Sequence, residues 1–163
     1  MVYAGEEAEL YPLLNEGLAL YQAGRWFDAH EICEHAWSGE VGRSKETLRA
    51  MIQVAAALHK HQEGNRRGPS KLLAKAKNTL AEVTSGCSSW LGIDLVALTQ
   101  EIERSLAAAD AYSRGETDAV PAPKMPASTG PDGILYLHGF ASGPSSFKAN
   151  AILPRLIETG FAV

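Results

Sequence analysis

Residues 25–37 read RWFDAHEICEHAW and carry two histidines, two glutamates and one cysteine among bulky apolar side chains. Polar and apolar residues recur there every three to four positions, which is the spacing of residues on one face of an α-helix. Gly24 precedes the stretch and Ser38-Gly39 follows it, and such residues commonly end helices. We therefore predict a helix over residues 26–37.

The same periodicity predicts helices on both sides of this one. They are expected over about residues 6–23, 45–63 and 69–83 and from residue 94 onward, with Ser44 as an N-cap. The connections are short, so consecutive helices should pack antiparallel around one core. A chain of 163 residues that is 45% hydrophobic can bury such a core. The sequence therefore predicts an all-α fold, an antiparallel helical bundle of about five helices over residues 6–115.

The chain changes character after the predicted bundle. Residues 116–132, ETDAVPAPKMPASTGPD, hold four prolines and few bulky apolar groups, which is typical of an extended linker. Residues 133–163 open with the apolar run GILYLHGF and continue with a helical pattern, so we predict a C-terminal βα fragment. One strand and one helix cannot bury a sheet, and this unit is therefore expected to be incomplete.

This last segment resembles the N-terminal end of an α/β-hydrolase of the small esterase group. The resemblance implies that His138, Gly139 and Phe140 lie in an oxyanion loop, where the backbone N–H of Phe140 or Ala141 would be the donor. The 163 residues contain no G-x-S-x-G nucleophile motif, so the segment as given cannot carry out acyl transfer. Two interpretations stay open: a fusion to a hydrolase that continues beyond Val163, or a short appendage.

Charge and cysteine content narrow the expected partners and compartment. The formal net charge of −4 argues against nucleic acid or an anionic membrane as a partner, because such binding relies on clustered Lys and Arg. Cys33 and Cys87 are too few for a disulfide framework, and the acidic N-terminus lacks the basic region of a signal peptide. We expect a soluble, cytoplasmic protein with a small-molecule substrate; a homodimer is left open.

The polar residues of the central helix allow two interpretations. His30 and Glu34 are four residues apart and share a stripe with Trp26 and Trp37, so we expect them to face the core. Burying either group without a partner would be unfavourable by several kcal/mol. In the structural interpretation the two groups satisfy each other and a neighbour such as Gln53, with Trp37 packed beside them.

The functional interpretation is a metal site. Imidazole and carboxylate groups four residues apart on a helix can chelate one divalent metal ion. We expect His30 and Glu34 as ligands, His59 from the following helix as the third ligand, and Glu31 as a general base. The HExxH pattern of metallopeptidases does not fit, because the second histidine, His35, comes five residues after the first.

YQAGRWFDAHEICEHAW (residues 21–37) and MIQVAAALHKHQEGNRRG (51–68) resemble a helical family known as domain of unknown function 309. The matching positions are Gly24, Trp26, Phe27, Asp28, His30, Glu31, Glu34, Trp37, Gln53, Ala55, Ala57, Leu58, Gly64, Asn65 and Gly68. The resemblance covers roughly residues 10–110 and implies an all-helical fold. It also implies a predicted metal-dependent hydrolase with His30, Glu31 and Glu34 as its polar site and Gln53 and His59 as contributors. Trp26 departs from the family, which more often has Phe or Tyr there.

Two function classes follow from these observations. The first is a metal-dependent hydrolase whose site is the His/Glu group. The second is a non-catalytic interaction or dimerisation module joined to an esterase whose catalytic part lies beyond residue 163.

Overall fold

The computed structural model describes residues 6–125, with side chains from residue 10 onward. The last part of the predicted linker, residues 126–132, lies outside this range. So does the predicted βα unit of residues 133–163 with its oxyanion-loop residues His138, Gly139 and Phe140. All structural statements below concern the described residues.

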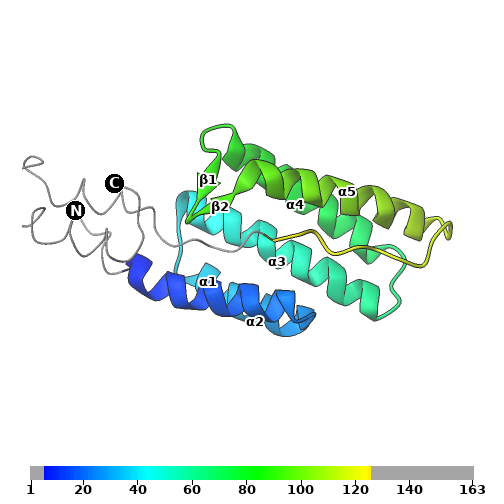
Figure 1. Cartoon of the computed structure of the whole chain (residues 1–163), viewed down its shortest axis with the longest axis horizontal. Helices are drawn as coiled ribbons and strands as arrows, with labels where there is room; N and C mark the ends of the chain where they lie inside the picture. Colours follow the sequence, from blue (N-terminus) through cyan, green and yellow to red (C-terminus); the bar gives the residue numbers. More distant parts are fainter. Residues whose placement is uncertain (1–5, 126–163) are drawn as a thin grey trace, which may run out of the picture. The chain divides into compact units, whose positions relative to one another are not determined.

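The described residues form an all-α bundle, as predicted. Its elements are α1 (Glu6–Gln22), α2 (Trp26–Ser38), α3 (Gly42–Gln62), α4 (Gly68–Thr84), β1 (Ser89–Trp90), β2 (Ile93–Asp94) and α5 (Leu95–Ser113). Each helix packs against the next one along the chain, and the helices run back and forth (Figure 1). Across residues 6–125, no helix has the length and apolar character needed to cross a membrane.

α3 lies at the centre of the bundle, because α2 packs on one of its sides and α4 on another. Its buried residues are correspondingly numerous: Thr47, Leu48, Ala50, Met51, Val54, Ala55, Ala57 and Leu58. The alanines among them let neighbouring helices approach closely, while Leu48 and Val54 fill the space between. Leucines of α1, α4 and α5, such as Leu14, Leu73 and Leu98, complete the same core.

Glycine residues follow the ends of α1 and α3 and reverse the chain there. Gly24 has a φ of +74° and Gly64 a φ of +73°, a conformation that glycine adopts without steric strain. The N–H of Gly24 donates to the carbonyl of Tyr21 at 3.0 Å, and that of Gly64 to His61 at 2.9 Å. These bonds satisfy the last carbonyls of α1 and α3 and allow the chain to reverse at once.

α3 begins three residues earlier than predicted. Its N-cap is Val41, and Ser44 is not a cap; the Ser44 hydroxyl instead accepts a hydrogen bond from Trp90 Nε1 at 3.0 Å. The prediction for Ser44 was wrong because the helix signal cannot reveal a partner 46 residues away.

The turn from α4 to α5 contains a small hairpin that the sequence did not predict. Ser89 pairs with Asp94 and Trp90 with Ile93, and Leu91-Gly92 form the turn with φ values of 46° and 76°. The predicted start of α5 is confirmed: Asp94 Oδ1 accepts hydrogen bonds from the N–H groups of Val96 and Ala97.

Residues 116–125, here called the strap, form neither helix nor strand and pack on the bundle. Val120, Pro123 and Met125 are buried. Tyr21 Oη of α1 donates to the carbonyl of Pro123 at 2.7 Å, and Glu101 of α5 accepts a hydrogen bond from the strap at 3.1 Å. After α5 the strap returns toward the bundle (Figure 1). The first half of the predicted linker is therefore part of the folded domain.

Arg66 holds the beginning of the strap. Its guanidinium donates to the carbonyls of Tyr112 and Thr117 at 3.3 and 3.1 Å and pairs with Asp118 at 2.7 Å. It also lies 4.4 Å from the centre of the Tyr112 ring. One side chain from the turn between α3 and α4 thus joins the end of α5 to the strap.

Candidate metal centre

The buried side of α2 consists of small residues. Ala29, Cys33 and Ala36 are its buried positions, and their spacing of four and three residues defines one stripe. A Cβ added to Gly17 of α1 would lie 2.9 Å from Cys33 Sγ, so the two helices approach closely there. Close packing against Gly17 therefore fixes which face of α2 is turned inward.

The prediction that His30 and Glu34 point into the bundle interior is wrong. They follow Ala29 and Cys33 by one residue each, which rotates them about 100° from the buried stripe. The His30 side chain is 26% exposed and the Glu34 side chain is 56% exposed. The polar pair therefore lies at the boundary with solvent, and neither group needs a hydrogen-bond partner in the core.

His30, Glu31 and Glu34 nevertheless converge. His30 Nδ1 lies 3.2 Å from Glu31 Oε1 and 4.0 Å from Glu34 Oε2. One ligand atom from each of the three residues lies within 4.8 Å of the others. A metal ion bound at about 2.1 Å needs its ligand atoms about 3.0–3.5 Å apart, so small side-chain rotations suffice to surround one ion.

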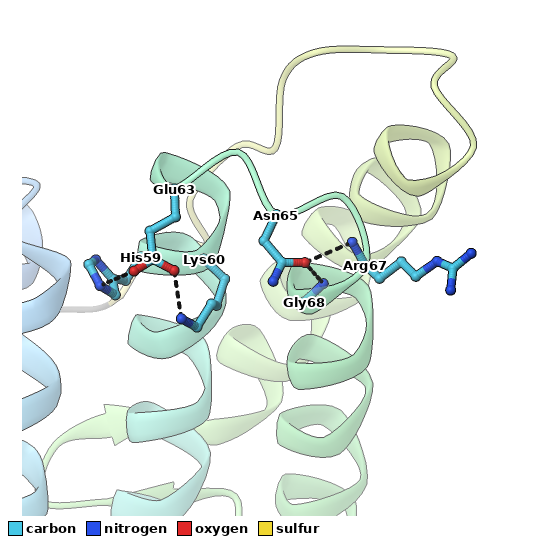
Figure 2. Close-up of polar contacts among 6 residues, drawn as sticks. All are labelled: His59, Lys60, Glu63, Asn65, Arg67 and Gly68. Atoms are coloured by element: carbon cyan, nitrogen blue, oxygen red, sulfur yellow. Dashed lines mark hydrogen bonds and ion pairs between the residues drawn. The ribbon is translucent and has the colours of Figure 1, made fainter.

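His59, the predicted third ligand, is not part of this group. Its Nε2 lies 3.2 Å from Oε1 of Glu63, the C-cap residue that follows α3 (Figure 2). The ring of Phe27 contacts both imidazoles, with its centre 6.4 Å from that of His30 and 5.2 Å from that of His59. Glu31, which was predicted as a base, takes the third position instead.

Gln53 and Trp37 were expected beside His30 and Glu34, but the structure gives them other contacts. Gln53 Oε1 accepts a hydrogen bond from Thr79 of α4 at 3.4 Å, so its amide faces α4. Lys45 Nζ lies 4.5 Å from the centre of the Trp37 ring. Trp37 Nε1 is buried and has no hydrogen-bond partner in the part of the chain that the structure describes. Trp37 therefore has a packing role, whereas Gln53 links α3 to α4.

The turn between α3 and α4 is built from its own polar contacts. Asn65 Oδ1 accepts hydrogen bonds from the N–H groups of Arg67 and Gly68 at 3.1 and 2.8 Å (Figure 2). A Cβ on Gly68 would lie 3.0 Å from Lys60 Cβ, so a larger residue would force the turn apart. Lys60 also donates a hydrogen bond to the Glu63 carboxylate. This bond, together with the nearby His59, lowers the pKa of the Glu63 carboxyl.

Two sets stand out among the residues that carry the family resemblance. Gly24, Gly64, Asn65 and Gly68 serve helix ends and turns, whereas His30, Glu31 and Glu34 form an accessible polar group. Residues 14–72 match a family model described as Domain of unknown function (DUF309). The DUF309 match extends from the middle of α1 into α4. It includes His30, Glu31 and Glu34, which we call the His30 group. No curated protein matches the chain.

Proposed function

We propose that His30, Glu31 and Glu34 bind one divalent metal ion on the outer side of α2. The convergence of one imidazole nitrogen and two carboxylate oxygens within 4.8 Å carries this proposal. All three residues lie within two turns of one helix, so the backbone keeps their Cα atoms close together before an ion arrives.

The donor set favours a borderline transition metal. Imidazole suits zinc and iron, while carboxylates also suit manganese, so a mixed set favours Zn²⁺, Fe²⁺ or Mn²⁺ over Ca²⁺. Coordination through Nδ1 of His30 leaves its proton on Nε2. Three protein ligands and exposed carboxylates leave room for water or substrate, as in catalytic rather than structural zinc sites.

We propose metal-dependent hydrolysis of a small molecule as the activity of this site. A bound ion would supply Lewis-acid polarisation and lower the pKa of a water molecule. Glu31 can hold the ion through one carboxylate oxygen and accept a proton from that water at the other. Phe27, which is 52% exposed, offers an apolar surface for substrate beside His30.

A second candidate function rests on the same exposed aromatic ring. Phe27 and the His30 group together form a surface that another protein can cover, which suits a non-catalytic interaction module. In this case the metal ion, or the polar group alone, would orient the partner. A chain that binds metal but hydrolyses no model ester or phosphoester would favour this candidate.

Metal analysis of the full chain tests the proposal. The protein is prepared without a histidine tag or chelator, and its metal content is measured alongside titration with Zn²⁺ and Mn²⁺. We expect one ion per chain in the wild type and at least about 100-fold weaker binding in His30→Ala and Glu34→Gln. His35→Ala, an exposed histidine on the same helix, is the matched control and should bind like the wild type. Equal binding by His30→Ala would overturn the proposal.

A further inference from the structure

Three sulfur-bearing side chains from three different elements line one small cavity. They are Cys33 of α2, Met51 of α3 and Met125 of the strap, and Gly17, Leu18 and Ala55 complete most of the lining. The cavity has a volume of about 10 Å³, which is room for one water-sized atom. Residues 6–125 contain four sulfur-bearing residues, and three of them line this cavity.

The chemistry of the cavity is unfavourable for water. Its lining is almost wholly apolar, and a buried water molecule needs two to four polar partners. The Cys33 thiol is 4% exposed and makes no hydrogen bond to any of the residues from 6 to 125. A polar S–H group is therefore buried beside an apolar space without a partner.

The charge of a bound ion decides whether this apolar cavity can accept it. A lone Cys33 thiolate would be poorly solvated in this apolar cavity, so it favours a ligand that cancels its charge. A monovalent cation bound to that thiolate gives a neutral unit, whereas a divalent cation would leave one uncompensated charge in an apolar site. Thiolate and thioether sulfur atoms are soft ligands that select Cu(I), Zn²⁺ and Fe–S clusters, and Cu(I) is the monovalent ion among these.

We propose that Cys33, Met51 and Met125 form a binding site for a single soft monovalent cation, Cu(I). On binding, the S–H bond of Cys33 breaks, its proton passes to solvent, and a sulfur–copper bond forms with no change in oxidation state. Met51 and Met125 contribute neutral thioether ligands. Because Met125 belongs to the strap, the site is complete only when the strap is docked. This site is separate from the His30 group and does not depend on it.

Competitive titration of the full chain tests this inference. Cu(I) is titrated without oxygen against a chromophoric Cu(I) chelator, and Ag(I) serves as a second, air-stable probe. We expect one tightly bound ion per chain and an ultraviolet thiolate-to-metal band. Cys33→Ser should abolish both, while Cys87→Ser, which removes the other cysteine, should leave both unchanged.

The thioether ligands are tested with Met51→Leu and Met125→Leu, which keep the side-chain volume nearly constant. Each should weaken Cu(I) binding at least about tenfold without loss of helical circular dichroism. The proposal is overturned if the wild type does not compete with the chelator, or if Cys87→Ser removes the binding. It is also overturned if both methionine variants bind as tightly as the wild type, because the thiol alone would then account for the signal.

Discussion

Gly17 of α1 and Cys33 of α2 lie in tight contact: a Cβ on Gly17 would lie 2.9 Å from the sulfur of Cys33. This contact turns the small-residue stripe of α2 inward and so places His30, Glu31 and Glu34 at the solvent boundary. The rotation of one helix thus decides whether the His/Glu group is buried or accessible.

Gly17→Ala should destabilise the protein despite the better helix propensity of alanine. The gain in propensity is about 1 kcal/mol, whereas overpacking a close helix contact disfavours folding by about 1–3 kcal/mol. Urea unfolding at neutral pH measures the balance. In a Cys33→Ala background the clash disappears, and the same substitution should become neutral or stabilising. Equal effects in both backgrounds would contradict the close contact.

The two cysteines should differ sharply in reactivity. Cys33 is buried and its thiol pKa is raised to about 12, so at about pH 8 only about one molecule in ten thousand carries the thiolate. Cys87 is partly exposed. A colorimetric thiol reagent should label one cysteine quickly in the native wild type and none quickly in Cys87→Ser. Fast labelling of Cys87→Ser without denaturant would show that Cys33 is accessible.

Tyr21→Phe should loosen the strap. The Tyr21 hydroxyl is the donor to the buried carbonyl of Pro123, and without it this carbonyl stays unsatisfied. We expect a loss of about 1–2 kcal/mol in the free energy of unfolding. Tyr11→Phe, at a partly exposed position of the same helix, is the control and should change stability by less than about 0.5 kcal/mol. Similar losses in both variants would argue against a docked strap.

Strap docking should also depend on pH through Glu101. The backbone N–H of Lys124, and then Arg104, hold the pKa of this carboxyl below its ordinary value. A lowered folded-state pKa means that the stabilisation is present above the unfolded pKa of about 4.3 and is lost as pH falls through the folded value. Hydrogen exchange or proteolysis at the strap should therefore increase on acidification below about pH 4.

Glu101→Gln isolates this contribution. The amide keeps the size of the side chain but removes its charge. The strap of this variant should therefore be less protected from hydrogen exchange and proteolysis at neutral pH, and acidification should reduce that protection by less than in the wild type. Glu103→Gln, in which the carboxylate pairs with Lys77 rather than with the strap, is the control. The same pH response in wild type and Glu101→Gln would exclude this role.

The sequence predicted the helices well because their signal is local. The spacing of apolar residues and the glycines at positions 24 and 64 determine where helices lie and end, without reference to other parts of the chain. The hairpin of residues 89–94 gave no comparable signal, because two strands of two residues are too short for an alternating pattern. The strap depends on partners such as Tyr21, about a hundred residues away, and composition cannot reveal these.

The candidate site was predicted in its residues but not in its placement. Spacing selected His30 and Glu34, and the structure brings their side chains together with Glu31. The burial was wrong because large apolar residues, Trp26 and Trp37, suggested the inward face, whereas the available space between α1 and α2 favours small residues. His59 was selected by its stripe on α3, but its Nε2 lies 3.2 Å from Glu63, the residue that follows the end of α3.

Anomalous diffraction from crystals of the full chain soaked in Zn²⁺ tests the central claim most directly. Data collected on both sides of the zinc absorption edge locate the ion without reference to activity. We predict a single strong peak bounded by His30 Nδ1 and carboxylate oxygens of Glu31 and Glu34, absent from His30→Ala crystals. A peak between His59 and Glu63 instead, or none near α2, would contradict the account.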